Sequence, residues 1–98
     1  MERMGDILVV DNTDLSRVEA LIESEVAGFA AYRERESTRI FTHTVVAPEF
    51  AGRGVGSTLA QGALDLARAE GKAVVPLCPF IKGWISKHPD YADLVVPY

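Results

Sequence analysis

The sequence predicts an α/β fold in which antiparallel strands come first and a parallel strand–helix–strand unit with a final helix follows. Three observations support this prediction. Runs of β-branched and alternating residues separated by polar turns occupy the chain up to Val46. A helical spacing of apolar residues begins at Val55, and a short, wholly apolar segment follows at residues 73–77. The 98 residues, 48% apolar and 24% charged, suit one domain, residues 1–98.

The first half of the chain predicts an antiparallel meander. Its expected strands are residues 7–10, 18–22, 26–35 and 39–46. Turn-forming residues separate them at 11–14, 23–25 and 36–38. The strand 39–46 is the strongest of the four because most of its residues are β-branched or aromatic.

The second half predicts a crossover from that strand back into the same sheet. A helix is expected from Val55 to a glycine C-cap at Gly71, and a buried strand at residues 73–77. Such a crossover places strands 39–46 and 73–77 side by side and parallel. Pro79 then suits the first turn of a second helix, which Pro89 ends.

Charge and cysteine content exclude several classes of protein. The net charge is −4 and no basic stripe is visible, so we expect no nucleic-acid partner. Arg33, Arg35 and Arg39 alternate with acids and are expected to be solvated. One cysteine cannot form an intramolecular disulfide. No apolar run is long enough to span a membrane and the start does not resemble a signal peptide, so we expect a cytoplasmic protein. We also expect it to be a monomer.

The most informative stretch joins the strongest strand to the first helix. It reads Val46, Ala47, Pro48, Glu49, Phe50, Ala51, Gly52, Arg53, Gly54, Val55, Gly56 and Ser57. Glycines at every second position let the backbone approach a ligand, and the unpaired amides of a helix's first turn attract anions. Arg53 adds a positive charge. A phosphate-binding loop is therefore favoured over a plain strand-to-helix turn, although the pattern is neither a Walker loop nor a dinucleotide fingerprint.

The same stretch resembles the acetyl-CoA loop of the GNAT N-acetyltransferases. Residues 75–81 and 88–95, and His43 with Thr44, are similar to a short, single-domain subfamily, related to the histone acetyltransferases. The resemblance implies a GNAT-like mixed sheet with a splayed parallel pair that receives pantetheine between residues 39–46 and 73–77. It implies acetyl-CoA as acyl donor, an amine acceptor of unknown identity, and binding of coenzyme A by Val46 and residues 51–57: Ala51, Gly52, Arg53, Gly54, Val55, Gly56 and Ser57.

The resemblance also names Cys78 and His43 as the catalytic pair, with His43 as base for the thiol. Cys78 precedes a helix start, where a thiol pKa is lowered and the thiolate could accept the acyl group. The sequence leaves open that Cys78 is a small buried hydrophobe. Trp84 falls where many GNAT enzymes have a tyrosine acid, Ala51 replaces an arginine or glutamine, and the helices that usually wall the acceptor site have no counterpart. A non-catalytic module that binds coenzyme A or senses acyl groups, or one that binds another nucleotide, therefore stays open.

Overall fold

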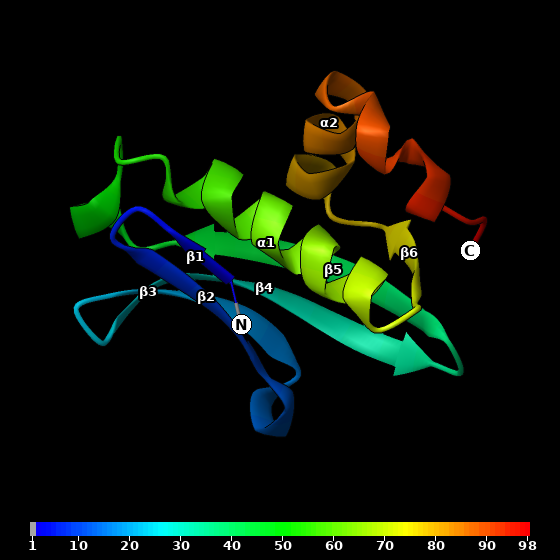
Figure 1. The fold of residues 1–98 in the computed structure, drawn as a ribbon, viewed down its shortest axis with the longest axis horizontal. Coiled ribbons are helices and arrows are strands. Elements are labelled where there is room, and N and C mark those ends of the chain that lie inside the picture. The colour runs from blue at the N-terminus through cyan, green and yellow to red at the C-terminus, as the bar shows by residue number, and fades with distance from the viewer. Residues whose placement is uncertain (1) are drawn as a thin grey trace.

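The computed structural model describes residues 2–98, with side chains from residue 5 onward. The strands form one mixed sheet in the order β1-β2-β3-β4-β5-β6, and α1 and α2 lie on the same side of it (Figure 1). The strands are β1 (Glu2–Met4), β2 (Ile7–Asn12), β3 (Arg17–Ile22), β4 (Glu25–Arg35), β5 (Thr38–Val46) and β6 (Ala73–Pro76). The helices are α1 (Val55–Ala69) and α2 (Pro79–Lys87), with 3-10 turns η1 (Thr13–Leu15), η2 (Pro48–Phe50) and η3 (Pro89–Leu94).

The predicted fold class is confirmed. Strands β1 to β5 pair antiparallel with their neighbours, and β5 pairs parallel with β6. The β3–β4 hairpin is closed by Glu23 and Ser24, both with positive φ, as a two-residue primed turn requires. Gly71 adopts φ +70° just past α1, which is the expected glycine at the end of a helix.

Helix α1 packs its apolar stripe against the middle of the sheet. Leu59, Ala63 and Ala67 are fully buried on that stripe. Gly62 allows the closest approach, because a Cβ placed there would lie 2.7 Å from Val9 Cγ1 on β2. Helix and sheet therefore share one core.

Strand β6 pairs along its whole length with the first half of β5. The register runs from Thr38 opposite Ala73 to Phe41 opposite Pro76, and from there to Val46 β5 is paired only with β4. The Cys78 N–H makes a last bond to the Phe41 carbonyl at 3.0 Å, after which the chain turns into α2. The parting of the parallel strands leaves the second half of β5 as a free edge on this side.

The sheet face opposite the helices is here called the open face. Within residues 2–98 no helix covers it. Register places Phe29 opposite Val45 and Ala31 opposite His43 on this face, and Val45 is 43% exposed.

No helix among the described residues is long and apolar enough to cross a membrane.

Several element boundaries differ from the predictions. Strand β2 continues through Asp11 and Asn12, expected in a turn, because both pair with β3. Strand β6 ends at Pro76, and Leu77 is 48% exposed beyond the last parallel pair. Neither β1 nor η3 was predicted, because neither has an apolar period of its own.

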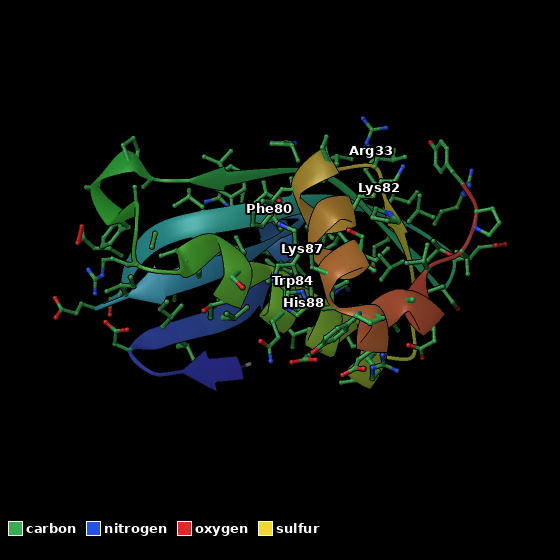
Figure 2. All side chains as sticks on the ribbon, turned by 90° about the horizontal axis from the view of Figure 1, so that it is seen from above. Arg33, Phe80, Lys82, Trp84, Lys87 and His88 are labelled. Atoms are coloured by element: carbon green, nitrogen blue, oxygen red, sulfur yellow. The ribbon has the colours of Figure 1, made fainter. Side chains whose placement is uncertain are left out.

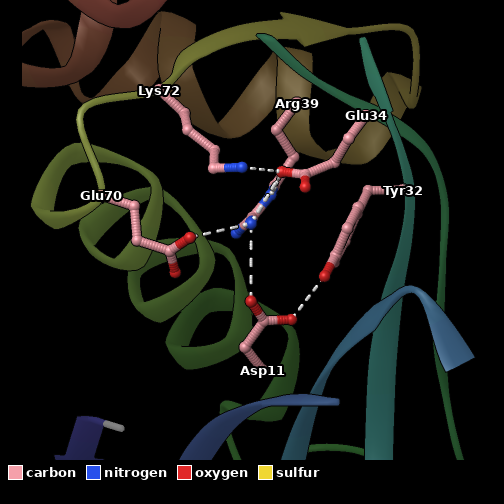
Figure 3. A network of polar contacts seen from close by, with 6 residues as sticks. All are labelled: Asp11, Tyr32, Glu34, Arg39, Glu70 and Lys72. Carbon is pink, nitrogen blue, oxygen red and sulfur yellow. Dashed lines mark hydrogen bonds and ion pairs between the residues drawn. The ribbon is translucent and has the colours of Figure 1, made fainter. Parts of the chain in front are cut away.

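The prediction that Arg39 is solvated is wrong, whereas Arg33 and Arg35 are exposed as expected. The Arg39 side chain is 1% exposed, and its guanidinium contacts Glu34 at 2.8 Å, Glu70 at 3.2 Å and Asp11 at 3.5 Å (Figure 3). It also lies 4.3 Å from the centre of the Tyr32 ring. This network ties β2, β4 and β5 to the carboxyl end of α1, away from the loop that precedes the helix.

Candidate functional site

The loop before α1 has the backbone geometry of an anion site. Gly52 and Gly54 have φ of +81° and +75°, and neither would have a neighbour within 4 Å of an added Cβ. Gly54 is the N-cap of α1 and makes no side-chain cap hydrogen bond. The amides of Val55, Gly56 and Ser57 in the first turn have no partner within the helix, so they can bind an external anion.

The side chain of Arg53 points from this loop toward the β1–β2 turn. Its Nη2 donates to Asp6 Oδ2 at 2.9 Å, and its guanidinium lies 5.7 Å from the centre of the Phe50 ring. The two side chains of the ion pair are 47% and 67% exposed, so the pair is weak and the guanidinium can turn toward a phosphate. Ala51 and Arg53 are themselves exposed, as a loop that meets a ligand requires.

The free edge of β5 offers backbone groups next to the loop. The Ala47 N–H donates to Ala27 O on β4 at 2.8 Å. Because inward and outward peptide groups alternate in an antiparallel ladder, Val46 and Thr44 direct their N–H and C=O groups away from β4, toward the gap left by β6. An extended amide chain could pair with them.

Cys78 lies at the point where this gap closes. Its side chain is 2% exposed, and Sγ lies 3.2 Å from Thr44 Oγ1, with either atom able to donate. The thiol is therefore buried on the helix side of the sheet, beside the free edge of β5. Sequence reasoning did not identify Thr44 as its partner.

The structure does not bring His43 and Cys78 together. Adjacent strand residues point to opposite faces, so the contact between Thr44 and Cys78 places His43 on the open face. There the exposed His43 ring packs edge-on against Phe29, with ring centres 6.0 Å apart, and Nδ1 lies 3.3 Å from Thr42 Oγ1. The expected direct role of His43 as base for the thiol has no contact to support it in this conformation.

Helix α2 flanks the first turn of α1. Trp84 is 7% exposed and donates from Nε1 to Ser57 Oγ at 2.9 Å, so the Ser57 hydroxyl is positioned by α2 and can still donate its own hydrogen to a ligand. His88 ends α2 and stacks on Trp84 with ring centres 3.7 Å apart. The Phe80 ring lies over Gly56 and remains 45% exposed (Figure 2). No sequence signal set Phe80 apart from a core residue.

Tyr91 does not replace the tyrosine acid that Trp84 lacks. Its hydroxyl donates to Asp65 Oδ1 at 2.7 Å on the side of α1, and its ring packs edge-on to Trp84. Burial and the bond to Asp65 raise the pKa of Tyr91 to about 12. The hydroxyl therefore stays protonated and engaged away from the gap.

Comparisons with known proteins identify a matching family and a solved structure with a similar fold. The family model of the GCN5-related N-acetyl-transferases matches residues 17–94. A search of curated proteins gives no match. The solution structure of a GCN5-like protein from Staphylococcus aureus, described as a candidate N-acetyltransferase, superposes with a TM-score of 0.69 at 22% identity, covering 97% of this chain and 93% of that chain.

Proposed function

The chain belongs to the GCN5-related N-acetyltransferase family, and from that premise we propose that it transfers an acetyl group from acetyl-CoA to an amine acceptor. One observation carries the proposal. The glycine loop at the start of α1 lies beside the free edge of β5, so a phosphate site and an amide-pairing strand follow one another along the chain. Coenzyme A matches this arrangement, because its pyrophosphate is joined to an arm that contains amide groups.

The loop residues would hold the pyrophosphate. The amides of Val55, Gly56 and Ser57 face the site, and the positive φ of Gly52 and Gly54 leaves it free of side chains. A helix amino terminus contributes only about 0.3–1 kcal/mol to anion binding at an exposed site, whereas micromolar affinity needs about 8 kcal/mol. Most of the affinity must therefore come from several amide contacts together with the pantetheine arm.

The free edge of β5 would hold that arm. Val46 and Thr44 offer alternate backbone groups, and Leu77, 48% exposed where β6 ends, offers an apolar contact. The thioester then lies where the strands part, beside Thr44 and Cys78. This end of the site has two possible reaction routes.

In the direct route the amine approaches from the open face. Its nitrogen attacks the thioester carbonyl, the carbon–sulfur bond breaks, and the coenzyme A thiolate leaves. His43 on that face takes the surplus proton from nitrogen through Nε2, while Thr42 contacts Nδ1. The exposure of His43 on a face without helices favours this route and suits a large acceptor, such as a protein amine.

In the second route Cys78 carries the acetyl group. Its sulfur attacks the thioester carbonyl, and coenzyme A leaves with the thiol proton. The amine then attacks the Cys78 thioester, the carbon–sulfur bond breaks, and the surplus proton of the amine returns to the Cys78 sulfur. The 3.2 Å contact of the thiol with Thr44 beside the gap favours it. Mass spectrometry of the intact protein after incubation with acetyl-CoA distinguishes the routes, since only this one adds an acetyl group that Cys78→Ala removes.

The coenzyme site is tested by a matched pair of glycine variants. Gly54 and Gly71 lie at opposite ends of α1, with similar φ of +75° and +70° and no atom within 4 Å of an added Cβ, so Gly54→Leu and Gly71→Leu should strain the backbone alike. Each is expected to cost about 1–2 kcal/mol of stability. Calorimetry should show that Gly54→Leu loses binding of coenzyme A while Gly71→Leu keeps it. Equal affinities in the two variants would refute the site.

A non-catalytic coenzyme A sensor is the second candidate, favoured by Trp84 where the family has a tyrosine acid and by the engagement of Tyr91 with Asp65. Turnover separates it from an enzyme. We expect release of free thiol from acetyl-CoA that depends on an added peptide amine. Tight binding without any amine-dependent release would establish the sensor instead.

A further inference from the structure

A hollow of about 350 Å³ lies between the turn that joins β1 to β2 and the turn that joins β3 to β4. The hollow is lined by Asp6, Leu8, Leu21, Glu23 and Ser24. Leu8 lies opposite Leu21 in the register, and the next residues, Val9 and Ile22, are buried under the helices. Because successive strand residues alternate between faces, the two leucines lie on the open face. The transfer reaction described above makes no use of this hollow.

The lining combines an apolar floor with two carboxylates at the rim. Leu8 and Leu21 are half-buried, whereas Asp6, Glu23 and Ser24 are exposed. A lysine or arginine side chain has the matching two parts, because its methylene stem packs on apolar surface while its charged head stays at a polar rim. The hollow therefore suits a basic side chain, and its carboxylates repel a phosphate.

The hollow is next to the donor loop but is not part of it. Asp6 on the rim accepts the 2.9 Å bond from Arg53 of that loop. Figure 1 shows both bordering turns at the same end of the sheet as the loop before α1. A group bound in the hollow would thus lie beside the proposed coenzyme site, on the face from which the amine approaches.

An apolar path on the open face leads from the hollow to His43. Val26 lies opposite Leu21 and is 40% exposed. Phe29 lies opposite Val45, and its ring packs edge-on against His43. A peptide laid along this path meets apolar side chains between the hollow and the histidine.

The length of this path sets the spacing between the two contacts. Leu21 and His43 lie on strands that flank β4, and their partners on β4, Val26 and Ala31, are five residues apart. The spacing of strands and of residues along them places Leu21 and His43 about 18 Å apart. An extended peptide covers that distance in about five residues.

We propose that the hollow recognises a lysine or arginine side chain of the acceptor, about five residues from the amine that is acetylated. The proposal rests on the proposed function, because the peptide must present its amine on the open face beside His43. The stem of the basic side chain packs on Leu8 and Leu21, and its cationic head pairs with Asp6 and Glu23. The hollow thus selects basic protein segments over small free amines, which cannot reach both places.

The test compares peptides of glycine and serine that carry one acceptor lysine. Either arginine or glutamine stands two, five or eight residues before or after that lysine. Arginine supplies a cation without offering a second amine for acetylation. With wild type, arginine at five residues in one direction should lower the peptide KM about fivefold relative to glutamine, and arginine at two or eight residues should change it little.

A matched pair of variants assigns the effect to the hollow. Glu23→Gln removes a carboxylate from the rim and should reduce the arginine effect to less than about twofold. Glu25→Gln also removes an exposed carboxylate, but Glu25 does not line the hollow and pairs with Ile22 in the register. This control should keep the fivefold effect.

Other outcomes separate this proposal from the proposed function. If wild type acetylates all the peptides alike, or Glu23→Gln keeps the fivefold effect, the hollow is not the recognition site and the proposed function stands. If no peptide is acetylated, the proposed function falls, and amide NMR decides whether the hollow binds a basic side chain. The signals of Leu8, Leu21 and Glu23 must then shift with the arginine peptide and not with the glutamine peptide, and equal or absent shifts overturn the hollow as well. If spermidine shifts these signals as readily as the arginine peptide, the occupant is a free polyamine and the peptide assignment is overturned.

Discussion

Replacing Arg39 tests whether the buried ion network is a stabilising feature of the fold. In Arg39→Gln the side chain loses the charge that contacts Glu34 at 2.8 Å and Glu70 at 3.2 Å. Removing one partner of a buried pair costs about 3–5 kcal/mol when the other charge stays buried. Here Glu34 and Glu70 are 36% and 40% exposed and keep part of their hydration, so we expect a loss of about 2–3 kcal/mol.

Urea denaturation with a thermal scan measures this loss. For a domain of this size it corresponds to a fall of about 10–20 °C in Tm. The matched control is Arg68→Gln, which breaks two 2.9 Å bonds to Asp93 between side chains that are 44% and 64% exposed. This control should stay near the wild-type midpoint, because exposed ion pairs contribute little.

The same network predicts a pH dependence. Burial alone would raise the pKa of Glu34, but its bonds to Lys72 and Arg39 outweigh burial and lower the pKa. Glu34 therefore stabilises the fold above pH 4.5, its ordinary value, and that contribution is lost as the pH falls further. The stability difference between wild type and Arg39→Gln should shrink as the pH falls below 4.5.

The reasoning is refuted if Arg39→Gln unfolds at the same urea concentration as Arg68→Gln. Nη1 of Arg39 is buried without a hydrogen-bond partner among the described residues. An unchanged midpoint would mean that the desolvation of the guanidinium cancels its ionic contacts.

Two further predictions concern packing and catalysis. Gly62→Ala should destabilise the fold by about 1–2 kcal/mol in urea, because the new Cβ lies within 2.9 Å of three Val9 side-chain atoms and the overpacking exceeds the gain in helix propensity. Gly83→Ala, with open space at its Cβ, should instead gain up to about 1 kcal/mol; a stabilised Gly62→Ala would contradict the close packing. On the direct route, His43→Gln should lower kcat about 10²-fold with KM for acetyl-CoA unchanged, and Cys78→Ala should have a much smaller effect. The reverse order in steady-state rates would establish the route through Cys78.

The features that could be predicted from the sequence are those that local residue patterns encode. The strand at residues 39–46, the glycine loop and α1 follow one another directly in the chain, so residue periodicity and turn-forming residues were sufficient to predict all three. The parting of the parallel strands could be expected from Pro76, which cannot donate a ladder hydrogen bond, and the register ends at that residue.

The features that were missed depend on residues distant in the chain. Arg39 is buried because Asp11, Glu34 and Glu70 surround it, and no sequence spacing relates those positions. Cys78 contacts Thr44 rather than His43 because the chain turns toward the helix side of the sheet after Pro76. A choice between two faces of a sheet cannot be read from alternation alone.

The most direct test of the account is a titration of nitrogen-15-labelled protein with acetyl-CoA, in which the backbone amide NMR signals are recorded at each step. We predict saturable shifts at Thr44, Val46 and residues 52–57, with far smaller shifts on β2 and β3. Shifts confined to other elements, or none at millimolar acetyl-CoA, would contradict the claim that this loop and strand edge bind the acyl donor.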